Sequence, residues 1–114
     1  MDGSVVGGAQ GTHWVEVARV EDIPRLGSRV VATAKGDIAL FRTSEDLVFA
    51  LDDHCPHKGG PLSQGIVHGQ AVTCPLHNWV IDLNSGEAQA PDVGCVKRTP
   101  VQVQEGRVML ALRA

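Results

Sequence analysis

The sequence has no long apolar run and no excess of charge of either sign. Its apolar stretches, such as those at 39–41 and 108–112, fall far short of the ~20 residues that a membrane-spanning helix needs. Residues 1–11 lack the basic and apolar regions of a secretory signal. The net charge is −3 and the ten lysines and arginines are scattered, which gives no nucleic-acid footprint. We therefore expect a soluble cytoplasmic protein with neither a membrane nor a nucleic acid as partner.

Cysteine is also scarce. Three cysteines cannot form a complete disulfide framework, because the number is odd. Cys55 and Cys74 stand in the short motifs C-P-H (55–57) and C-P-L-H (74–77), where they are better used as thiolate ligands in a reducing compartment. Cys95 precedes a predicted strand, far from either motif in the sequence, and we predict that it is a small buried hydrophobic residue.

Helical periodicity is missing as well. No segment keeps a 3.6-residue apolar period over the ~11 residues of an average helix, and no repeat appears beyond the two motifs. Short β-branched stretches at regular spacing predict strands. These are residues 14–20, 29–33, 37–42, 47–51, 79–83, 100–103 and 107–112. Gly36 can adopt positive φ in one of the turns between them, and Glu21-Asp22-Ile23-Pro24 favours a single short helical turn. The fold class is all-β.

The length favours one domain, since 114 residues can bury a core without disulfides. Residues 1–11 contain four glycines and little to bury, so we predict a flexible tail there and a single domain at 12–114. The last two predicted strands alternate apolar and polar residues. This alternation predicts one mostly buried face made of Val101, Val103, Val108, Leu110 and Leu112.

The two motifs together offer two thiolates and two imidazoles, from Cys55, His57, Cys74 and His77. With the residues that follow each motif, to Leu62 and to Trp79, they resemble the two cluster-binding loops of the Rieske family. The resemblance covers about 51–86 and implies a [2Fe-2S] cluster held by these four residues, with two histidines on one iron and two cysteines on the other. It also implies an antiparallel β-sandwich or small barrel with a cluster-binding subdomain of two loops.

A tetrahedral zinc site is the rival interpretation of the same four ligands. The single residue between Cys55 and His57 is below the usual spacing for two ligands on one zinc, which favours the cluster. Gly59 and Gly60 allow the backbone to approach a cluster, although an ordinary tight turn would also use them. Pro56, Pro61 and Pro75 fix φ and would stiffen the loops, whether or not they have a further role.

Rieske proteins of respiratory complexes carry a disulfide between these loops, and this chain has Gly60 and Leu76 at the two positions. Those proteins also place a hydroxyl donor after the second motif, where this chain has Asn78 and Trp79. Fewer donors to the cluster sulfurs mean less stabilisation of the reduced state. We therefore predict a reduction potential in the lower part of the Rieske range of about −150 to +300 mV.

A narrower resemblance lies in residues 57–67, 74–79 and 85–88, which are similar to the small subunit of assimilatory NAD(P)H-dependent nitrite reductase. This resemblance implies an electron-transfer subunit that supports reduction of nitrite to ammonium. Its partner would be a large subunit that holds the flavin and the sirohaem. Two alternatives remain open: a free Rieske ferredoxin that serves an aromatic-ring dioxygenase, and a cluster that only stabilises an interface.

No catalytic residue is predicted, because a cluster with four protein ligands has no open position for a substrate. For Trp79 we predict core packing or a lid over His77 rather than an electron conduit. His13 is expected at a strand entry, His54 in a solvated loop and His68 in a turn, all without a role. The cations Lys58, Lys97 and Arg98 could help to dock a partner, but a solvated surface is the simpler interpretation.

Overall fold

The computed structural model describes residues 12–34, 36–56, 60–75 and 78–113. The predicted tail at 1–11 lies outside these residues. The strands are β1 (Thr12–Arg19), β2 (Gly27–Thr33), β3 (Gly36–Arg42), β4 (Val48–Asp52), β5 (Ile66–His68), β6 (Ala71–Thr73), β7 (Val80–Asp82), β8 (Arg98–Thr99), β9 (Val101–Gln104) and β10 (Arg107–Arg113). Two short 3₁₀ helices are η1 (Val20–Asp22) and η2 (Leu62–Gln64). The all-β prediction is therefore confirmed.

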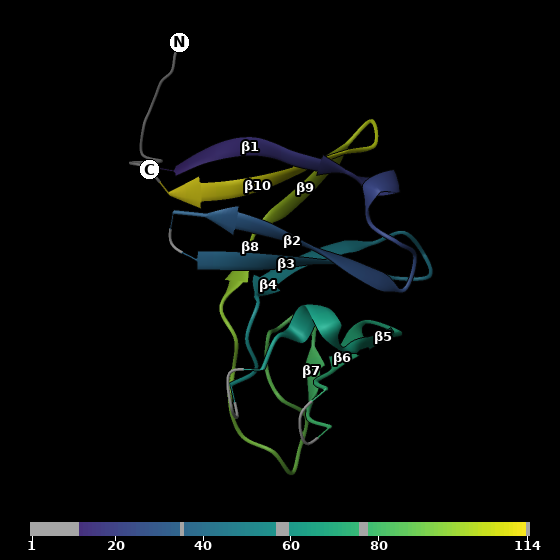
Figure 1. Cartoon of the computed structure of the whole chain (residues 1–114), viewed down its shortest axis with the longest axis vertical. Helices are drawn as coiled ribbons and strands as arrows, with labels where there is room; N and C mark the ends of the chain where they lie inside the picture. The colour runs from purple at the N-terminus through teal and green to yellow at the C-terminus, as the bar shows by residue number, and fades with distance from the viewer. Residues whose placement is uncertain (1–11, 35, 57–59, 76–77, 114) are drawn as a thin grey trace.

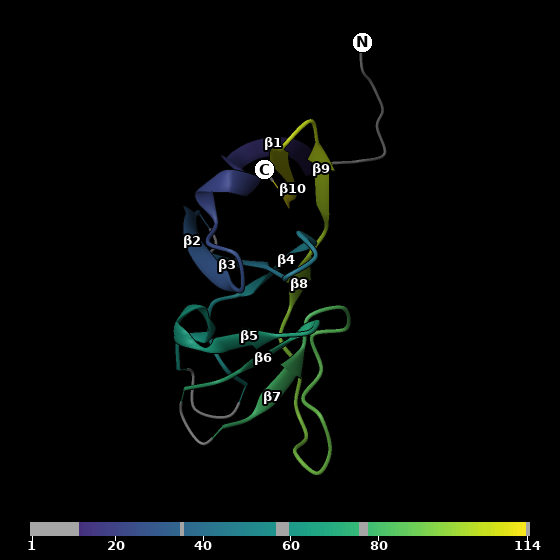
Figure 2. The same cartoon turned by 90° about the vertical axis from the view of Figure 1, so that its right-hand side faces the viewer.

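The described strands form three antiparallel sheets, as Figure 1 shows. The first has the order β1-β10-β9, and the second has the order β2-β3-β4-β8. These two sheets enclose the upper half of the molecule, and a third sheet, β5-β6-β7, lies below them (Figure 2). The described part of the chain thus has a barrel-like half and a smaller subdomain at one end.

The hairpin of β3 and β4 joins the two halves because both of its faces are buried. Successive side chains of a strand point to opposite faces. Ile38 and Leu40 face a core shared with β1 and β10, whereas Ala39 and Phe41 face a core shared with the subdomain. In β4 the same alternation separates Ala50 from Leu51. The nearly continuous apolar run of β3 is what a strand buried on both faces requires.

The seven predicted strands are present, with ends shifted by one or two residues. The predicted helical turn is η1, which begins at Val20 and ends before Pro24. Gly36 has the predicted positive φ, at 118°. Three strands were not predicted, β5, β6 and β8, because they are only two or three residues long and depend on pairing across the fold.

The predicted buried face of β9 and β10 is only partly correct. Val108 and Leu110 are buried, but Val103 is exposed because β9 is the edge strand of its sheet. Val101 and Leu112 are partly buried and pack against the upper core. Among the described residues, no helix has both the length and the apolar character needed to cross a membrane.

Candidate functional site

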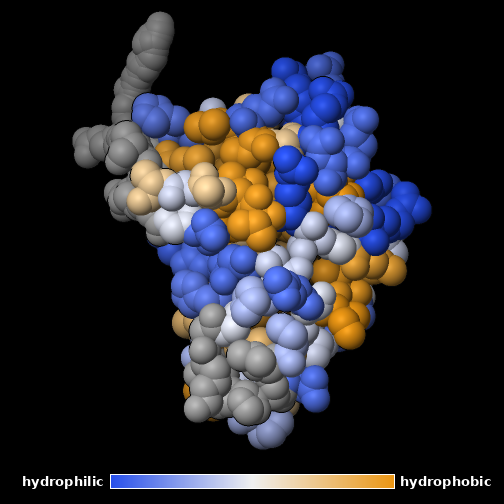
Figure 3. Space-filling model, viewed as in Figure 1, coloured by the Kyte–Doolittle hydropathy of each residue, from blue (hydrophilic) through white to orange (hydrophobic). Residues whose placement is uncertain are grey.

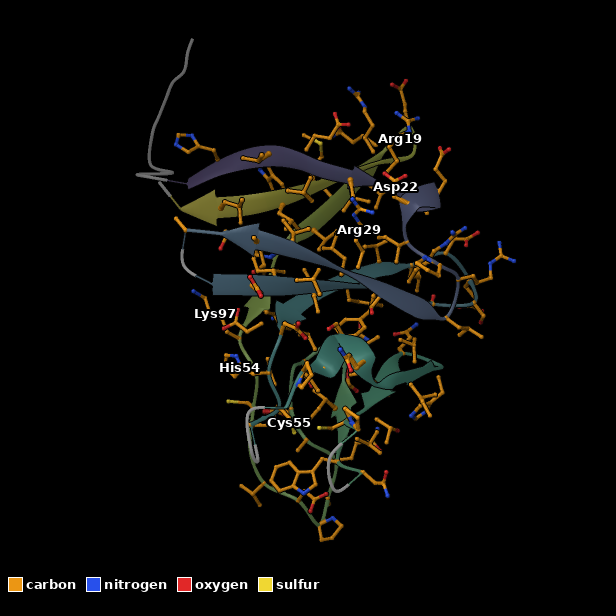
Figure 4. The ribbon with its side chains drawn as sticks, in the orientation of Figure 1. Arg19, Asp22, Arg29, His54, Cys55 and Lys97 are labelled. Atoms are coloured by element: carbon orange, nitrogen blue, oxygen red, sulfur yellow. The ribbon has the colours of Figure 1, made fainter. Side chains whose placement is uncertain are left out.

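Cys55 and Cys74 begin two loops at the lower end of the molecule. Cys55 follows β4 after a two-residue bend, and Cys74 follows β6 directly. Their exposed fractions are 2% and 0%, and both belong to the core cluster shared by the subdomain and β3. Figure 4 shows Cys55 in this lower half, below His54. Two cysteines 19 positions apart in the chain are therefore buried in the same core.

Each cysteine loop is closed by a backbone hydrogen bond of the same type. The N–H of Cys55 donates to the carbonyl of Gly60, five residues later, at 2.7 Å. The N–H of Cys74 donates to the carbonyl of Trp79, also five residues later, at 2.7 Å. Each motif thus opens a loop of the same span, which is the arrangement expected of two halves of one binding site.

A third loop packs against both cysteine loops. It runs from Ala88 to Cys95, and the N–H of Ala88 donates to the carbonyl of Gly94 at 2.9 Å. A Cβ on Gly94 would lie 3.1 Å from Cβ of Pro56 and 3.4 Å from the Trp79 ring. Gly94 also has φ of +157°, so a larger residue is disfavoured by its backbone as well. No motif in the sequence predicted a role for this loop, although Pro91, Asp92 and Gly94 are turn residues.

Asp53 and Ser63 lie at the two ends of the first cysteine loop. The backbone N–H and the hydroxyl of Ser63 both donate to the Asp53 carboxylate, at 2.7 Å and 2.9 Å. The hydroxyl of Ser28, on β2, donates to the Ser63 carbonyl at 2.5 Å. These contacts fasten the loop to the barrel, and no sequence motif had identified them.

The described thiols fit the thiolate half of a Rieske-type [2Fe-2S] cluster. A thiolate in an apolar core is costly unless a cation compensates it. Cys55 and Cys74 are both free of disulfides and buried in one core, so bound iron would supply that compensation. The predicted imidazole ligands, His57 and His77, lie outside the described residues, as do Lys58, Gly59 and Leu76.

The structure corrects the prediction for Cys95. Its thiol is exposed rather than buried, because the next residue, Val96, occupies the buried position and adjacent side chains of an extended chain alternate. Cys95 is distant from both motifs in the sequence but close to both cysteine loops in space, because a Cβ on its neighbour Gly94 would lie 3.1 Å from Pro56 and 3.4 Å from Trp79.

The other predicted positions have mixed outcomes. Trp79 is partly buried against the lower core, which confirms core packing. His13 lies at the start of β1, and His54 is exposed in the bend after β4, both as predicted. The prediction for His68 is wrong, because this residue ends β5 and its Nε2 lies 2.7 Å from the Thr73 hydroxyl across the β5–β6 hairpin. Lys97 and Arg98 are exposed.

A group of charged side chains lies at the turn between β3 and β4. A hydrogen bond from Arg42 lowers the pKa of Asp46 from its ordinary value, and the nearby charge of Arg25 acts in the same direction. Arg42 also donates to the carbonyls of Val20 and Ile23. This group fastens η1 to the turn between β3 and β4 and is structural.

Comparisons with known proteins identify relatives of this chain. Residues 13–100 match the model of the Rieske [2Fe-2S] domain. The chain is 33% identical over 102 residues to the ferredoxin component of the naphthalene 1,2-dioxygenase/salicylate 5-hydroxylase systems of Ralstonia sp., covering 88% of this chain and 96% of that protein. It is 36% identical over 98 residues to the ferredoxin subunit of 3-phenylpropionate/cinnamic acid dioxygenase of Photorhabdus laumondii, covering 84% and 91%.

Among solved structures, the fold is similar to that of a proposed NADH-dependent nitrite reductase small subunit from Mycobacterium tuberculosis. The TM-score is 0.79 at 24% identity, and the match covers 90% of this chain and 97% of that one. At this identity the likeness shows the fold.

Proposed function

Because this chain belongs to the Rieske [2Fe-2S] domain family, we propose that it is the electron-transfer subunit of an assimilatory nitrite reductase. In this role it supports NAD(P)H-dependent reduction of nitrite to ammonium on a large flavin- and sirohaem-containing partner subunit in the cytoplasm. The chain itself is an electron carrier with a Rieske-type [2Fe-2S] cluster. Residues 12–114 act as one domain, with the cluster-binding part at about 51–86.

The observation that supports the carrier role is the pair of equivalent cysteine loops. Cys55 and Cys74 each begin a loop that is closed by a hydrogen bond from the cysteine N–H to the carbonyl five residues later. Both side chains are buried in one core. We assign Cys55 and Cys74 to one iron, and His57 and His77 to the other. The bound cluster would accept and donate one electron at a time. The fold holds the two thiols away from water.

Nitrite reductase is our first candidate because of the residues around the ligands. Residues 57–67, 74–79 and 85–88 are similar to the small subunit of that enzyme. The length agrees too, since the chain covers 97% of the Mycobacterium tuberculosis protein with a TM-score of 0.79.

A free Rieske ferredoxin is the second candidate. The relatives from Ralstonia and Photorhabdus are ferredoxin components of dioxygenase systems, at 33% and 36% identity over nearly their full length. Their identities are higher than that of the nitrite reductase neighbour. In this case the chain would deliver electrons from a flavin reductase to an aromatic-ring dioxygenase.

Affinity capture with the tagged full-length chain separates the two candidates. Cells grown on nitrate as the nitrogen source would supply the partners, and mass spectrometry would identify the bound chain. We expect a large subunit that contains sirohaem and flavin. Capture of an oxygenase or a flavin reductase in its place would reject the nitrite reductase proposal and support the ferredoxin.

An activity assay provides a second test of the nitrite reductase proposal. The purified large subunit would be assayed for NAD(P)H oxidation coupled to nitrite, with and without this chain. Full activity with Cys74→Ser, which lacks a predicted ligand, would mean that the cluster is not on the electron path. We expect the variant to bind the large subunit but to fail in turnover.

A further inference from the structure

A cavity of about 670 Å³ lies between the two sheets of the upper half of the molecule. This volume is within the range of about 300–1,000 Å³ that is typical of small-molecule sites. Its walls come from both sheets and are mostly apolar. They include Val15 and Val17 of β1, Val31 of β2, Ile38 of β3 and Leu112 of β10.

The cavity exists because the barrel is not closed between β1 and β2. Each of these strands is an edge of its own sheet, and no ladder among the described residues joins them. Val15 lines the cavity and yet is 39% exposed. Apolar side chains gather over β1 and β2 on the face shown in Figure 3. Covering apolar surface of this kind with an apolar ligand lowers the free energy.

Positive groups are in excess at the polar part of the wall. Lys97 and Arg98 line the cavity together with a single carboxylate, Asp52. The Arg98 guanidinium already has one hydrogen-bond partner, the Asn84 carbonyl, at 2.5 Å. No ion pair or side-chain hydrogen bond of Lys97 is formed with the described residues. Its ammonium is therefore available to an anion.

We propose that this cavity binds a single-chain amphipathic carboxylate, such as a medium-chain fatty acid. The hydrocarbon chain would lie against Val15, Val31 and Leu112, and the carboxylate would pair with Lys97. The site is distinct from the cysteine loops, which lie in the lower half of the molecule (Figure 4). The proposal is independent of the electron-transfer partner.

The rival occupant is the chain's own N-terminal segment. Residues 1–11 precede β1, whose His13 lines the cavity, and they include Val5 and Val6. This segment has a single acidic side chain, that of Asp2, and it lies three residues before the apolar pair, whereas a fatty acid has its carboxylate at the end of a wholly apolar chain. Charge complementarity with Lys97 favours the external carboxylate.

Calorimetric titration of the holoprotein with monomeric decanoate and with 1-decanol tests the proposal. We expect both to bind, and decanoate to bind more tightly. Lys97→Gln should weaken decanoate by roughly two- to five-fold, the range of an exposed ion pair, and leave 1-decanol unchanged. Arg107→Gln, a cation that does not line the cavity, is the matched control and should change neither.

Two adjacent valines of β2 supply a second pair of variants. Val31→Phe would fill the cavity and should abolish binding of both ligands. Val30→Phe places the same ring on the residue next to it, which does not line the cavity, and should leave binding intact. Thermal unfolding of each variant would verify that it folds. If Val31→Phe does not fold, the comparison of Lys97→Gln with Arg107→Gln still tests the proposal.

Two results would overturn the proposal. The first is failure of decanoate to bind the full-length chain. The second is binding only after deletion of residues 1–11, which would identify the N-terminal segment as the natural occupant. Equal affinity for decanoate in the wild type and in Lys97→Gln would also reject the assigned carboxylate site.

Discussion

Ser63 holds the carboxylate of Asp53 with two hydrogen bonds, from its backbone N–H at 2.7 Å and from its hydroxyl at 2.9 Å. The pair lies outside the Cys55–Gly60 hydrogen bond and closes the first cysteine loop a second time. The backbone N–H of Asp53 donates to the Asp37 carbonyl on β3 at 3.1 Å. Because Ser28 on β2 also donates to the Ser63 carbonyl, the loop that supplies the first predicted ligand is fixed to two strands of the barrel, β2 and β3.

Replacement of Asp53 should loosen this loop. We expect Asp53→Ala to lower the free energy of unfolding by about 1–3 kcal/mol, because the Ser63 donors lose their partner. Asp53→Asn should cost less, since an amide oxygen can still accept from the Ser63 N–H. Urea unfolding and the rate of cluster loss, followed by visible absorbance, would measure the effect. Asp37→Ala is the control, because only the backbone of Asp37 takes part; equal stability of Asp53→Ala and this control would contradict the prediction.

The three cysteines should behave differently. Cys55→Ser and Cys74→Ser should lose the visible spectrum of the cluster, whereas Cys95→Ser should keep it, because the Cys95 thiol is exposed and is not a predicted ligand. In the folded holoprotein a thiol reagent should modify Cys95 alone, since Cys55 and Cys74 are buried. Mass spectrometry would locate the label. Loss of the cluster in Cys95→Ser would show that the third loop holds it as well.

Gly94→Ala should disturb the contact between the third loop and the two cysteine loops. A Cβ there would be 3.1 Å from Pro56, and the backbone φ of +157° is unfavourable for alanine. Gly69→Ala is the matched control in the same subdomain, because its φ is +56° but nothing lies within 4 Å. The control should lose about 1–2 kcal/mol from conformation alone. We expect a larger loss for Gly94→Ala, together with a changed cluster circular dichroism spectrum; equal losses would mean that the loops adjust freely.

Asp46 should contribute a pH-dependent part of the stability. Since the hydrogen bond from Arg42 lowers the pKa of Asp46 in the folded state, its stabilisation is present above the unfolded pKa of about 4 and is lost as the pH falls through the lower folded value. Asp46→Asn should therefore be less stable than the wild type at neutral pH, and the difference should shrink in acid. Thermal unfolding between neutral and acidic pH would test this. A stability difference that stays the same from neutral to acidic pH would contradict the prediction.

The reduction potential should be low for a Rieske protein. The chain has Asn78 and Trp79 after the second motif instead of a hydroxyl donor, so the reduced cluster receives less stabilisation. We expect a midpoint below zero at neutral pH, in the lower part of the family range of about −150 to +300 mV. Protein-film voltammetry of the holoprotein would measure it. A positive midpoint would show that donors from elsewhere in the fold reach the sulfurs.

Local sequence was sufficient wherever one strand and its own turn decide the structure. The strand-forming residues at 37–42 predicted β3, and Gly36 predicted the turn before it. It was not sufficient for β5 and β6, whose three residues each gain stability only by pairing. The same holds for His68, which was predicted in a turn and ends a strand.

By itself, the sequence determined the chemistry of the protein: the two cysteine motifs, their spacing, and the missing disulfide pair at Gly60 and Leu76. The motifs and their spacing follow from residue type and order alone, and the missing disulfide follows from the resemblance to the Rieske proteins of respiratory complexes. Only the tertiary structure decided that Cys95 is exposed and beside the cysteine loops, and that Asp53 and Ser63 clamp the first of them. It also decided that a cavity remains between β1 and β2. The physical reason is that burial and cross-strand contact depend on which distant segments pack together, and no local pattern records that.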